Sequence, residues 1–290
     1  MTMQRRRFLT LSAAAIASPV LGADVQEWHG RAFGAATRIT LTGTDVHKAT
    51  RLFQRIEAEV VRIESHFSLH VDSALTRLNR DGRLAWPAPE ILALFDLAGQ
   101  VHAATGGAFD PTVQPLWQAM AIGGDVMRAR RLLGWSKVRV SNAEIALPPG
   151  AALTFNGIAQ GQAADRRAAM VRKPGFGDVL IDMGEIIALG QNPQGRAWRA
   201  DIALPDGQVV ARHILHGALA TSAPMGTVIG AGLPHILDPQ GAPPRWHLAS
   251  VEAPQAAVAD ALSTAFCVMN PGQITRALAQ FPLTRLIALT

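Results

Sequence analysis

The sequence predicts an α+β protein with mixed or antiparallel sheets and packed helices. Helical and strand patterns are interspersed along the 290 residues, without the regular strand–helix alternation of a doubly wound sheet. Two hairpins are recognisable, one within residues 138–147 and one across the turn at 205–207. Hydrophobic residues make up 49% of the chain and charged residues 17%, a balance that provides a large core and excludes a disordered chain or a coiled coil.

Helices are predicted where apolar residues recur three or four positions apart. The clearest case covers residues 45–64, where Asp45 is placed to cap the first turn. A second helix is expected over 89–104 and is ended by Gly106 and Gly107. Further helices are expected at 161–172 and 257–269, with a shorter one from about residue 273.

Strands are predicted where apolar residues alternate with polar ones or form short buried runs. The turn at 205–207 joins segments 200–204 and 209–215, which gives the second hairpin. Single strands are expected at 179–183, 227–230 and 286–289. The glycine- and proline-rich stretches between these elements are only loop-sized, so residues 24–290 are expected to form one domain whose lobes are not sharply separated.

Residues 1–23 have the features of an export signal. Arg5, Arg6 and Arg7 precede an apolar, alanine-rich run, and small residues end the segment before Asp24. The arginines followed by Phe8 resemble the twin-arginine signal, which exports folded and often cofactor-loaded proteins. An ordinary secretory signal is the alternative, and both routes predict a protein of the periplasm.

Charge and cysteine content exclude several classes of protein. The net charge of +5 includes the three arginines of the signal, so the rest of the chain carries only +2 and has no broad basic field for nucleic acid. Cys267 is the only cysteine, which excludes an internal disulfide and a zinc site built from several cysteines. After the signal, no apolar run approaches the ~20 residues that a transmembrane helix needs.

Five segments carry residues suited to binding and chemistry: 65–79, 105–112, 154–165, 234–241 and 259–264. The double glycine of the second lets the backbone approach a ligand, and the third opens a helix whose free N–H groups suit a phosphate. In the fifth, Asp260 and Thr264 share one face of a helix, and their oxygens suit Mg²⁺ rather than zinc. Each segment alone also has a structural explanation, such as a helix stop or a charge that favours a helix terminus.

Taken in order, the five segments resemble the ApbE-like family of FAD:protein FMN transferases, which are exported bacterial flavinyltransferases. The resemblance extends from about Phe33 to Pro271, most of the chain, and implies the ApbE-like fold with an FAD cleft between its lobes. It is carried by Ser65, Phe67, Leu78 and Asn79; by 108–112; by Gly157, Ile158, Ala159, Gly161 and Asp165; by Thr221, Ser222, His235, Ile236, Asp238 and Pro239; and by Ala259, Asp260 and Thr264.

The resemblance implies an enzyme that cleaves the pyrophosphate of FAD, transfers FMN to a threonine or serine hydroxyl of a client protein and releases AMP. By the family pattern, Mg²⁺ would be held by Asp260, Thr264 and the main-chain carbonyl of Gly157. His235 is expected to take the hydroxyl proton, because neutral imidazole is a competent base near pH 7, and Asp238 is expected to orient His235 or the metal. FAD would contact Phe33, Phe67, Ala108, Phe109, Asp110, Thr154, Gln160 and Ile236.

Four positions depart from the family pattern. Thr154 replaces a usual aspartate and Gln160 a common lysine, which removes two charge-assisted contacts. Glu185 stands where the second glycine of a Gly-Gly-Asp turn is usual, and Ala223 stands where a glycine is usual. These differences are expected to alter the affinity for FAD or its orientation, whereas the metal-binding helix of the pattern is intact.

The sequence therefore leads us to expect a periplasmic, Mg²⁺-dependent flavinyltransferase whose client is another exported or membrane protein. One branch of the family serves maturation of nitrous oxide reductase by flavinylating its membrane-bound electron donor, and the twin-arginine signal suits that branch. Two alternatives stay open. One is a periplasmic FAD-binding or carrier protein that transfers no flavin, and the other is an FAD pyrophosphatase in which water is the acceptor.

Overall fold

The computed structural model describes residues 9–11, 25–172 and 176–290. The predicted signal peptide, residues 1–23, lies outside the described residues except for 9–11, which form the short strand β1 (Leu9–Leu11). In the described part of the chain, no helix is both long enough and apolar enough to span a bilayer.

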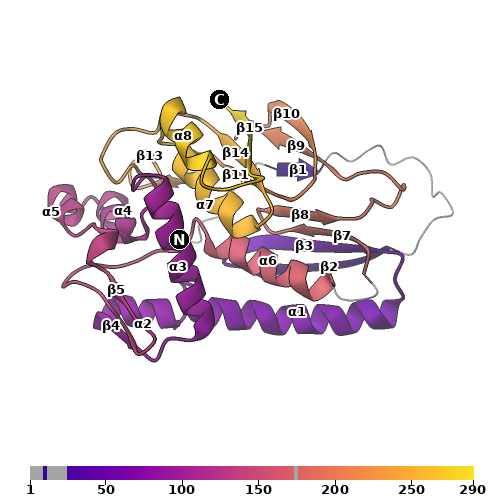
Figure 1. Ribbon diagram of the computed structural model, residues 1–290, viewed down its shortest axis with the longest axis horizontal. Coiled ribbons are helices and arrows are strands. Elements are labelled where there is room, and N and C mark those ends of the chain that lie inside the picture. Colours follow the sequence, from indigo (N-terminus) through magenta and orange to yellow (C-terminus); the bar gives the residue numbers. More distant parts are fainter. Residues whose placement is uncertain (1–8, 12–24, 173–175) are drawn as a thin grey trace.

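A seven-stranded sheet forms the centre of the fold, with strand order β15-β14-β11-β8-β7-β3-β2 (Figure 1). Each pairing between neighbouring strands of this sheet is antiparallel, which confirms the predicted α+β class. Its strands are β2 (Val25–Ala32), β3 (Ala35–Thr42), β7 (Asp178–Asp182), β8 (Ile186–Leu189), β11 (Ala218–Ser222), β14 (Ala249–Ala253) and β15 (Arg285–Leu289).

Both faces of this sheet are covered, because successive side chains along a strand point to opposite faces. In β7, Val179 and Ile181 belong to the core under the helices, whereas Leu180 packs against a smaller sheet. The smaller sheet contains β1, β9 (Arg199–Ala203) and β10 (Val209–Ile214), with β9 in the middle. Its β9–β10 hairpin is the second hairpin that the sequence predicts.

The other predicted hairpin belongs to a third, peripheral sheet. Here β6 (Glu144–Ala146) lies between β4 (Arg83–Ala85) and β5 (Arg139–Val140), and both pairings are antiparallel. A further pair joins β12 (Val228–Ile229) to β13 (Leu233–Pro234).

The helices lie mostly on one face of the central sheet, with the long α1 along its β2 side (Figure 1). Asp45 caps α1 by accepting a hydrogen bond from the Lys48 N–H at 3.0 Å, as the sequence predicts. The helices are α1 (Val46–Phe67), α2 (Ala74–Asp81), α3 (Pro89–Ala104), α4 (Gln114–Ile122), α5 (Val126–Arg131), α6 (Ala159–Val171), α7 (Ala256–Phe266) and α8 (Pro271–Leu278), with short 3-10 turns at Pro111–Val113 and Trp135–Lys137.

Helices α6 and α7 cross at very short range, and a glycine permits the contact. An ideal Cβ at Gly161 would lie 2.4 Å from the carbonyl oxygen of Ala256 and 2.6 Å from Cα of Ala257. Any side chain here would force the two helices apart. The crossing fixes how the start of α6 faces the middle of α7, which carries Asp260.

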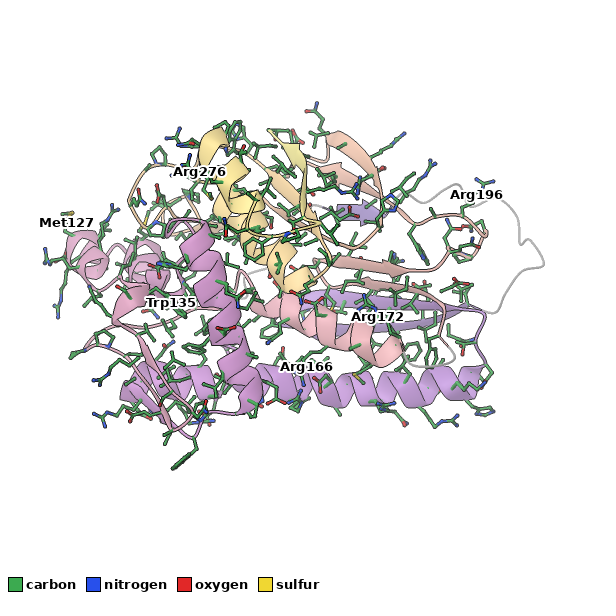
Figure 2. All side chains as sticks on the ribbon, in the orientation of Figure 1. Met127, Trp135, Arg166, Arg172, Arg196 and Arg276 are labelled. Atoms are coloured by element: carbon green, nitrogen blue, oxygen red, sulfur yellow. The ribbon has the colours of Figure 1, made fainter. Side chains whose placement is uncertain are left out.

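Four charged side chains form an ion-pair network that links α1 to α3 and α6. Arg166, its member on α6, is labelled in Figure 2. Glu59 accepts from Arg62 at 2.7 Å and from Arg166 at 2.6 Å, and Glu90 accepts from the same two arginines at 2.7 and 3.4 Å. Hydrogen bonding from Arg62, assisted by Arg166, lowers the pKa of Glu59 to about 2 despite its partial burial. The carboxylate is therefore kept charged far into the acidic range.

We expect Gly161→Ala to lower the free energy of unfolding by about 1–3 kcal/mol, because overpacking at the α6–α7 crossing displaces both helices. Urea unfolding monitored by circular dichroism measures the change. Gly177→Ala is the matched control, since an ideal Cβ there meets no atom within 4 Å. Equal effects of the two substitutions would contradict the close crossing.

We expect Glu59→Gln to reduce stability at pH 7 and to reduce it progressively less as the pH falls from about 4.5 towards 2. The pKa of Glu59 drops from its ordinary 4.5 to about 2 on folding, so its stabilisation is complete above 4.5 and is lost as the acid range is entered. Urea unfolding of both proteins at pH 7 and pH 3 tests this. Glu144→Gln, which removes one looser ion pair at 3.5 Å, is the control. A stability difference that is the same at both pH values would refute the assignment.

Candidate functional site

One cavity of about 470 Å³ collects residues from all five segments singled out in the sequence. It is bounded by the ends of β3, β7 and β11, by α4, and by the N-terminal part of α6 with α7. Its volume lies in the range of small-molecule sites. A more open depression of about 580 Å³ lies between α3 and α8, and of the five segments it receives only Thr105 and Gly106. The first cavity is therefore the one at which the five predicted segments meet.

The three residues expected to hold a metal lie together in the wall of this cavity. An ideal Cβ built on Gly157 would be 3.0 Å from Oγ1 of Thr264, so the backbone of Gly157 approaches that hydroxyl closely. Asp260 is 6% exposed, and its Oδ2 accepts a hydrogen bond from the N–H of Gly161 at 3.3 Å. The α6–α7 crossing thus brings a carboxylate, a hydroxyl and a main-chain segment to one point.

This group suits a hard cation by the chemistry of its donors. A carboxylate oxygen, a hydroxyl oxygen and a carbonyl oxygen are ligands of the kind that Mg²⁺ takes, with water or substrate phosphate completing the shell. Within the described ranges, no three His, Cys, Asp or Glu side chains group closely enough to hold a metal. The expected ligand group, one carboxylate with a hydroxyl and a carbonyl oxygen, differs from the three or four His and Cys ligands typical of a zinc site.

Asp165 holds the beginning of α7 in place from α6. Its two carboxylate oxygens accept from the N–H groups of Ala256 and Ala257, at 2.7 and 2.9 Å. Gln255 at the N-cap position provides no side-chain bond, so Asp165 is the residue that satisfies these helix-terminal donors. Burial raises the pKa of Asp165, and the two amide hydrogen bonds oppose that rise. The aspartate of the third segment therefore supports the start of α7 without lining the cavity.

The loop at 105–112 presents its backbone and Asp110 to the cavity. Gly106 and Gly107 adopt positive φ values of 60° and 83°, conformations that favour glycine, and they turn the chain out of α3. Oδ1 of Asp110 accepts from both the N–H and the hydroxyl of Thr112, at 2.8 and 2.6 Å. The Asp110 carboxylate is thereby fixed, and Ala108, Phe109 and Asp110 all line the cavity.

Asn79 joins the first segment to the third through two hydrogen bonds. Its amide donates to the carbonyl of Leu153 at 2.8 Å and accepts from the N–H of Leu153 at 2.7 Å. The next residue, Thr154, then donates its N–H to the carbonyl of Pro111 at 2.9 Å. Asn79 therefore sets the position of the cavity wall without itself lining it.

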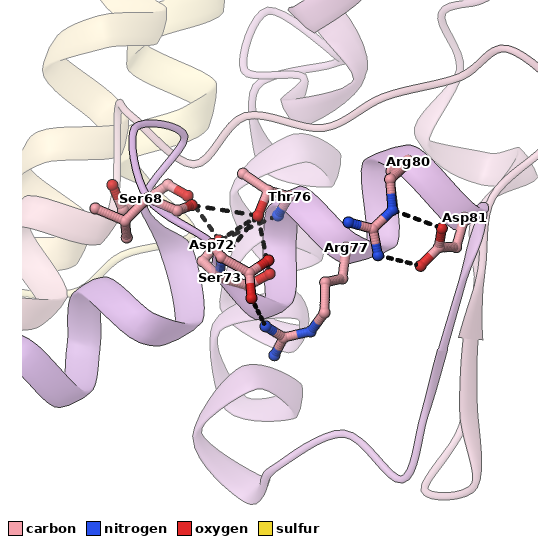
Figure 3. Close-up of polar contacts among 8 residues, drawn as sticks. Ser68, Asp72, Ser73, Thr76, Arg77, Arg80 and Asp81 are labelled. Atoms are coloured by element: carbon pink, nitrogen blue, oxygen red, sulfur yellow. Dashed lines mark hydrogen bonds and ion pairs between the residues drawn. The ribbon is translucent and has the colours of Figure 1, made fainter.

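Helix α2, which carries Asn79, begins at a capping box (Figure 3). Ser73 Oγ accepts from the N–H of Thr76 at 3.0 Å, and Oγ1 of Thr76 accepts from the N–H of Ser73 at 2.8 Å. Ser73 also donates its hydroxyl proton to the carbonyl of Ser68 at 2.7 Å, which ties the end of α1 to the start of α2. Ion pairs Arg77–Asp72 and Arg80–Asp81 lie on the outer side of this helix.

His235 lies in the cavity wall with a defined tautomer. Its Nδ1 is 2.9 Å from the carbonyl oxygen of Pro224 and 3.1 Å from that of Thr227. Carbonyl oxygens only accept, so Nδ1 carries the proton and Nε2 is the basic nitrogen of the neutral ring. Asp238, the other predicted catalytic residue, instead accepts from the N–H groups of Gln240 and Ala242 at 2.8 and 3.3 Å and closes its own turn.

The predicted flavin-contacting residues divide into two groups. Phe67 is 2% exposed and meets Phe155 edge-on in the core, and Phe33 sits at the β2–β3 turn with its N–H 2.6 Å from Oε1 of Glu64. Neither ring lines the cavity. The structure brings together the others at the cavity wall: Ala108, Phe109, Asp110, Thr154, Gln160 and Ile236.

All four departures from the family pattern face the same cavity: Thr154, Gln160, Glu185 and Ala223. Oγ1 of Thr154 accepts from the N–H of Asn156 at 3.2 Å, and the Gln160 amide donates to the carbonyl of Met183 at 3.3 Å. Further along α6, Arg167 is fully buried, and burial lowers its pKa to about 10 although Glu185 and two other glutamates oppose this. At these four positions the cavity wall therefore presents two neutral polar side chains, one carboxylate and one methyl group.

Several lining residues are not predicted from the sequence: Gln114, Trp117, Gln118, Asn156 and Asp182. Three of them lie on α4, a short helix that sequence analysis does not identify. Pro115 in its first turn was the available signal, because proline favours the start of a helix. Asp182 ends a buried strand, and a carboxylate at the end of an apolar strand was the sequence signal that it belongs to a site.

Comparison with known proteins gives one family and several structures of the same fold. The family model of the ApbE family matches residues 33–287. Among solved structures, the flavinyl transferase ApbE of Pseudomonas stutzeri in its apo form is 24% identical with a TM-score of 0.75, covering 91% of this chain and 89% of that one. The flavin transferase ApbE of Vibrio cholerae is 23% identical with a TM-score of 0.76 and coverages of 91% and 93%.

The ApbE protein of Thermotoga maritima is 24% identical with a TM-score of 0.78, covering 92% of this chain and 96% of that one. At these identities the likeness to the three structures establishes a shared fold. The comparison with curated protein sequences gives no match.

We expect Asn79→Ala to lower the free energy of unfolding by about 2–3 kcal/mol, because it leaves the buried N–H and carbonyl of Leu153 without partners. Denaturant unfolding measures this loss. Asn142→Ala, at an exposed position of the β5–β6 turn, is the control and should change stability by less than about 0.5 kcal/mol. A loss at Asn79 as small as the control's would show that the two hydrogen bonds do not hold the wall.

Proposed function

The chain belongs to the ApbE family, and on that ground we propose that it is an Mg²⁺-dependent FAD:protein FMN transferase. The reaction would move FMN from FAD to a threonine or serine hydroxyl of a client protein and release AMP. The observation that carries the proposal is the convergence of five separate segments on one cavity whose wall contains Gly157, Asp260 and Thr264. Two proteins of the same fold, the flavinyl transferase ApbE of Pseudomonas stutzeri and the flavin transferase ApbE of Vibrio cholerae, support the same activity.

The residues of the wall have the properties that phosphoryl transfer requires. Asp260, Thr264 and the carbonyl of Gly157 would hold Mg²⁺, which supplies charge neutralisation at the pyrophosphate. Asp110 and the backbone of the 105–112 loop would orient the dinucleotide, since their hydrogen bonds already fix them before ligand binds. Helices α6 and α7 behind the wall are closely packed, so these residues need little rearrangement when the ligand binds.

The chemical step needs a base for the client hydroxyl. The client oxygen would attack the phosphorus of the FMN half, and the P–O bond to AMP would break, with AMP leaving with the bonding electrons. The hydroxyl proton would pass to Nε2 of His235, because Nδ1 already holds its proton against the carbonyl of Pro224. Asp238 would act only through the turn that it closes, residues 238–242, which follows His235 in the chain.

Two other activities fit the same cavity and are outcomes of the test. An FAD pyrophosphatase would use water as acceptor and yield FMN and AMP. A periplasmic FAD carrier would bind the dinucleotide without cleaving it. The neutral Thr154 and Gln160 at the wall favour the carrier, because both lack the charge usual at these positions.

We also propose a cellular compartment for this protein. The twin-arginine-type signal at 1–23 supports export of the folded chain to the periplasm. The client would then be an exported or membrane protein, and the membrane-bound electron donor of nitrous oxide reductase is the client that we favour. Its acceptor threonine or serine must reach the cavity from outside.

We expect Asp260→Asn to lower the rate of AMP release and client flavinylation by about two to three orders of magnitude, because it removes the only charged group among the three proposed Mg²⁺ ligands. The mature chain is incubated with FAD, Mg²⁺ and the acceptor domain of the electron donor. AMP is measured by chromatography, and the mass of the acceptor is measured in the same samples. A chelator should abolish both products.

Asp96→Asn, on the exposed face of α3, is the matched control and should leave both rates unchanged. Acceptor mass increased by FMN supports the transferase. AMP and free FMN with an unmodified acceptor would instead identify the pyrophosphatase. Bound FAD that persists without AMP in the wild-type protein would identify the carrier.

A further inference from the structure

We propose that Ser222 is a positioning residue for the metal site, because it fixes the proton of the Thr264 hydroxyl and so directs a lone pair of that oxygen at the cation. The inference rests on the proposed function, since it concerns the Mg²⁺ site of the same cavity. Ser222 ends β11 and lines the cavity, and α7 packs across that strand. Ser222 itself would not bind the metal and would act only through Thr264.

Three hydroxyl groups form a chain between β11 and α7. Oγ of Ser222 lies 3.3 Å from Oγ1 of Thr264 and 2.8 Å from Oγ of Ser263. Ser263 in turn donates its hydroxyl proton to the carbonyl oxygen of Asp260 at 3.0 Å. The chain therefore begins at one proposed metal ligand and ends on the backbone of another.

Only one arrangement of the three protons satisfies all three contacts. A carbonyl oxygen cannot donate, so the proton of Ser263 must lie towards Asp260. Ser263 then accepts, which means that Ser222 donates to it. With its single proton used in this way, Ser222 can only accept from Thr264. The proton of the Thr264 hydroxyl is thus directed towards Ser222.

The usual competitor for the Thr264 proton is already engaged. A threonine in a helix commonly donates its hydroxyl to the carbonyl four residues earlier, which for Thr264 is the carbonyl of Asp260. Ser263 donates to that carbonyl at 3.0 Å, and the hydroxyl of Thr264 instead faces Ser222 at 3.3 Å. Thr264 therefore keeps its lone pairs for the side that Gly157 approaches, where the cation would sit.

The consequence is a preorganised ligand. Groups that hold a metal ligand by hydrogen bonding set its orientation, and their removal typically weakens metal binding or activity about 10- to 100-fold. Ser222→Ala should therefore weaken metal binding about 10- to 100-fold while leaving FAD affinity nearly unchanged. Saturating Mg²⁺ should restore most of the transfer rate, because the ligands themselves remain.

The experiment measures Mn²⁺ binding directly. The mature protein is titrated with Mn²⁺ in the presence of FAD, and free Mn²⁺ is followed by electron paramagnetic resonance. The variants are Ser222→Ala, Ser222→Thr, Ser263→Ala and the double variant with alanine at both serines. Ser250→Ala is the matched control. The buried hydroxyl of Ser250 bonds Thr221 on the same strand pair and does not belong to the chain of three hydroxyl groups.

The expected Mn²⁺ affinities of these variants are specific to a chain of hydroxyl groups whose hydrogen bonds all run in one direction. Ser222→Thr should retain Mn²⁺ binding, Ser263→Ala should weaken it less than Ser222→Ala, and the double variant should bind no more weakly than Ser222→Ala alone. Additive effects of the two serines, or wild-type Mn²⁺ affinity in a folded Ser222→Ala protein, would overturn the proposal. If Ser222→Ala does not fold, unchanged Mn²⁺ binding by Ser263→Ala overturns it in the same way. A wild-type protein that binds no Mn²⁺ would instead overturn the metal site of the proposed function.

Discussion

The close crossing of α6 and α7 is the contact on which the rest of the site depends. Gly161 admits the backbone of Ala256 and Ala257 at a distance that no side chain would permit, and its N–H reaches the carboxylate of Asp260. Asp165, one turn later on α6, satisfies the first N–H groups of α7. Backbone geometry therefore places Asp260 before any ligand is present.

The sheet contributes to the site by being covered on both faces. Alternating side chains in β7 and β11 pack against the helices on one side and the small sheet on the other, so the strands have little freedom to shift. Their ends can then carry polar groups at fixed positions. Asp182 ends β7 and Ser222 ends β11, and both face the cavity. A buried sheet thus provides a rigid support for polar residues at its edge.

Sequence reasoning predicted the parts whose signals are local. The apolar spacing and cap of α1 and the proline and glycines that bound α3 specify those helices almost residue by residue. The β2–β3 hairpin was missed because β2 is a half-exposed edge strand with a mixed pattern. Phe67 was expected at the flavin, yet its ring lies in the core, because a sequence motif does not distinguish packing from contact. The proximity of Gly157, Asp260 and Thr264 was predictable only because the family resemblance joined segments far apart in the chain.

The two hydrogen bonds between Asn79 and Leu153 span 74 positions of sequence, and the bond from Gly161 to Asp260 spans 99. Closing loops of this length costs conformational entropy, and the wall of the cavity exists only once these loops are closed. Neither half of the polypeptide contains both members of the Asn79 contact. A chain that ends before Leu153 consequently cannot form the complete wall of the cavity, because one partner of the Asn79 contact is missing.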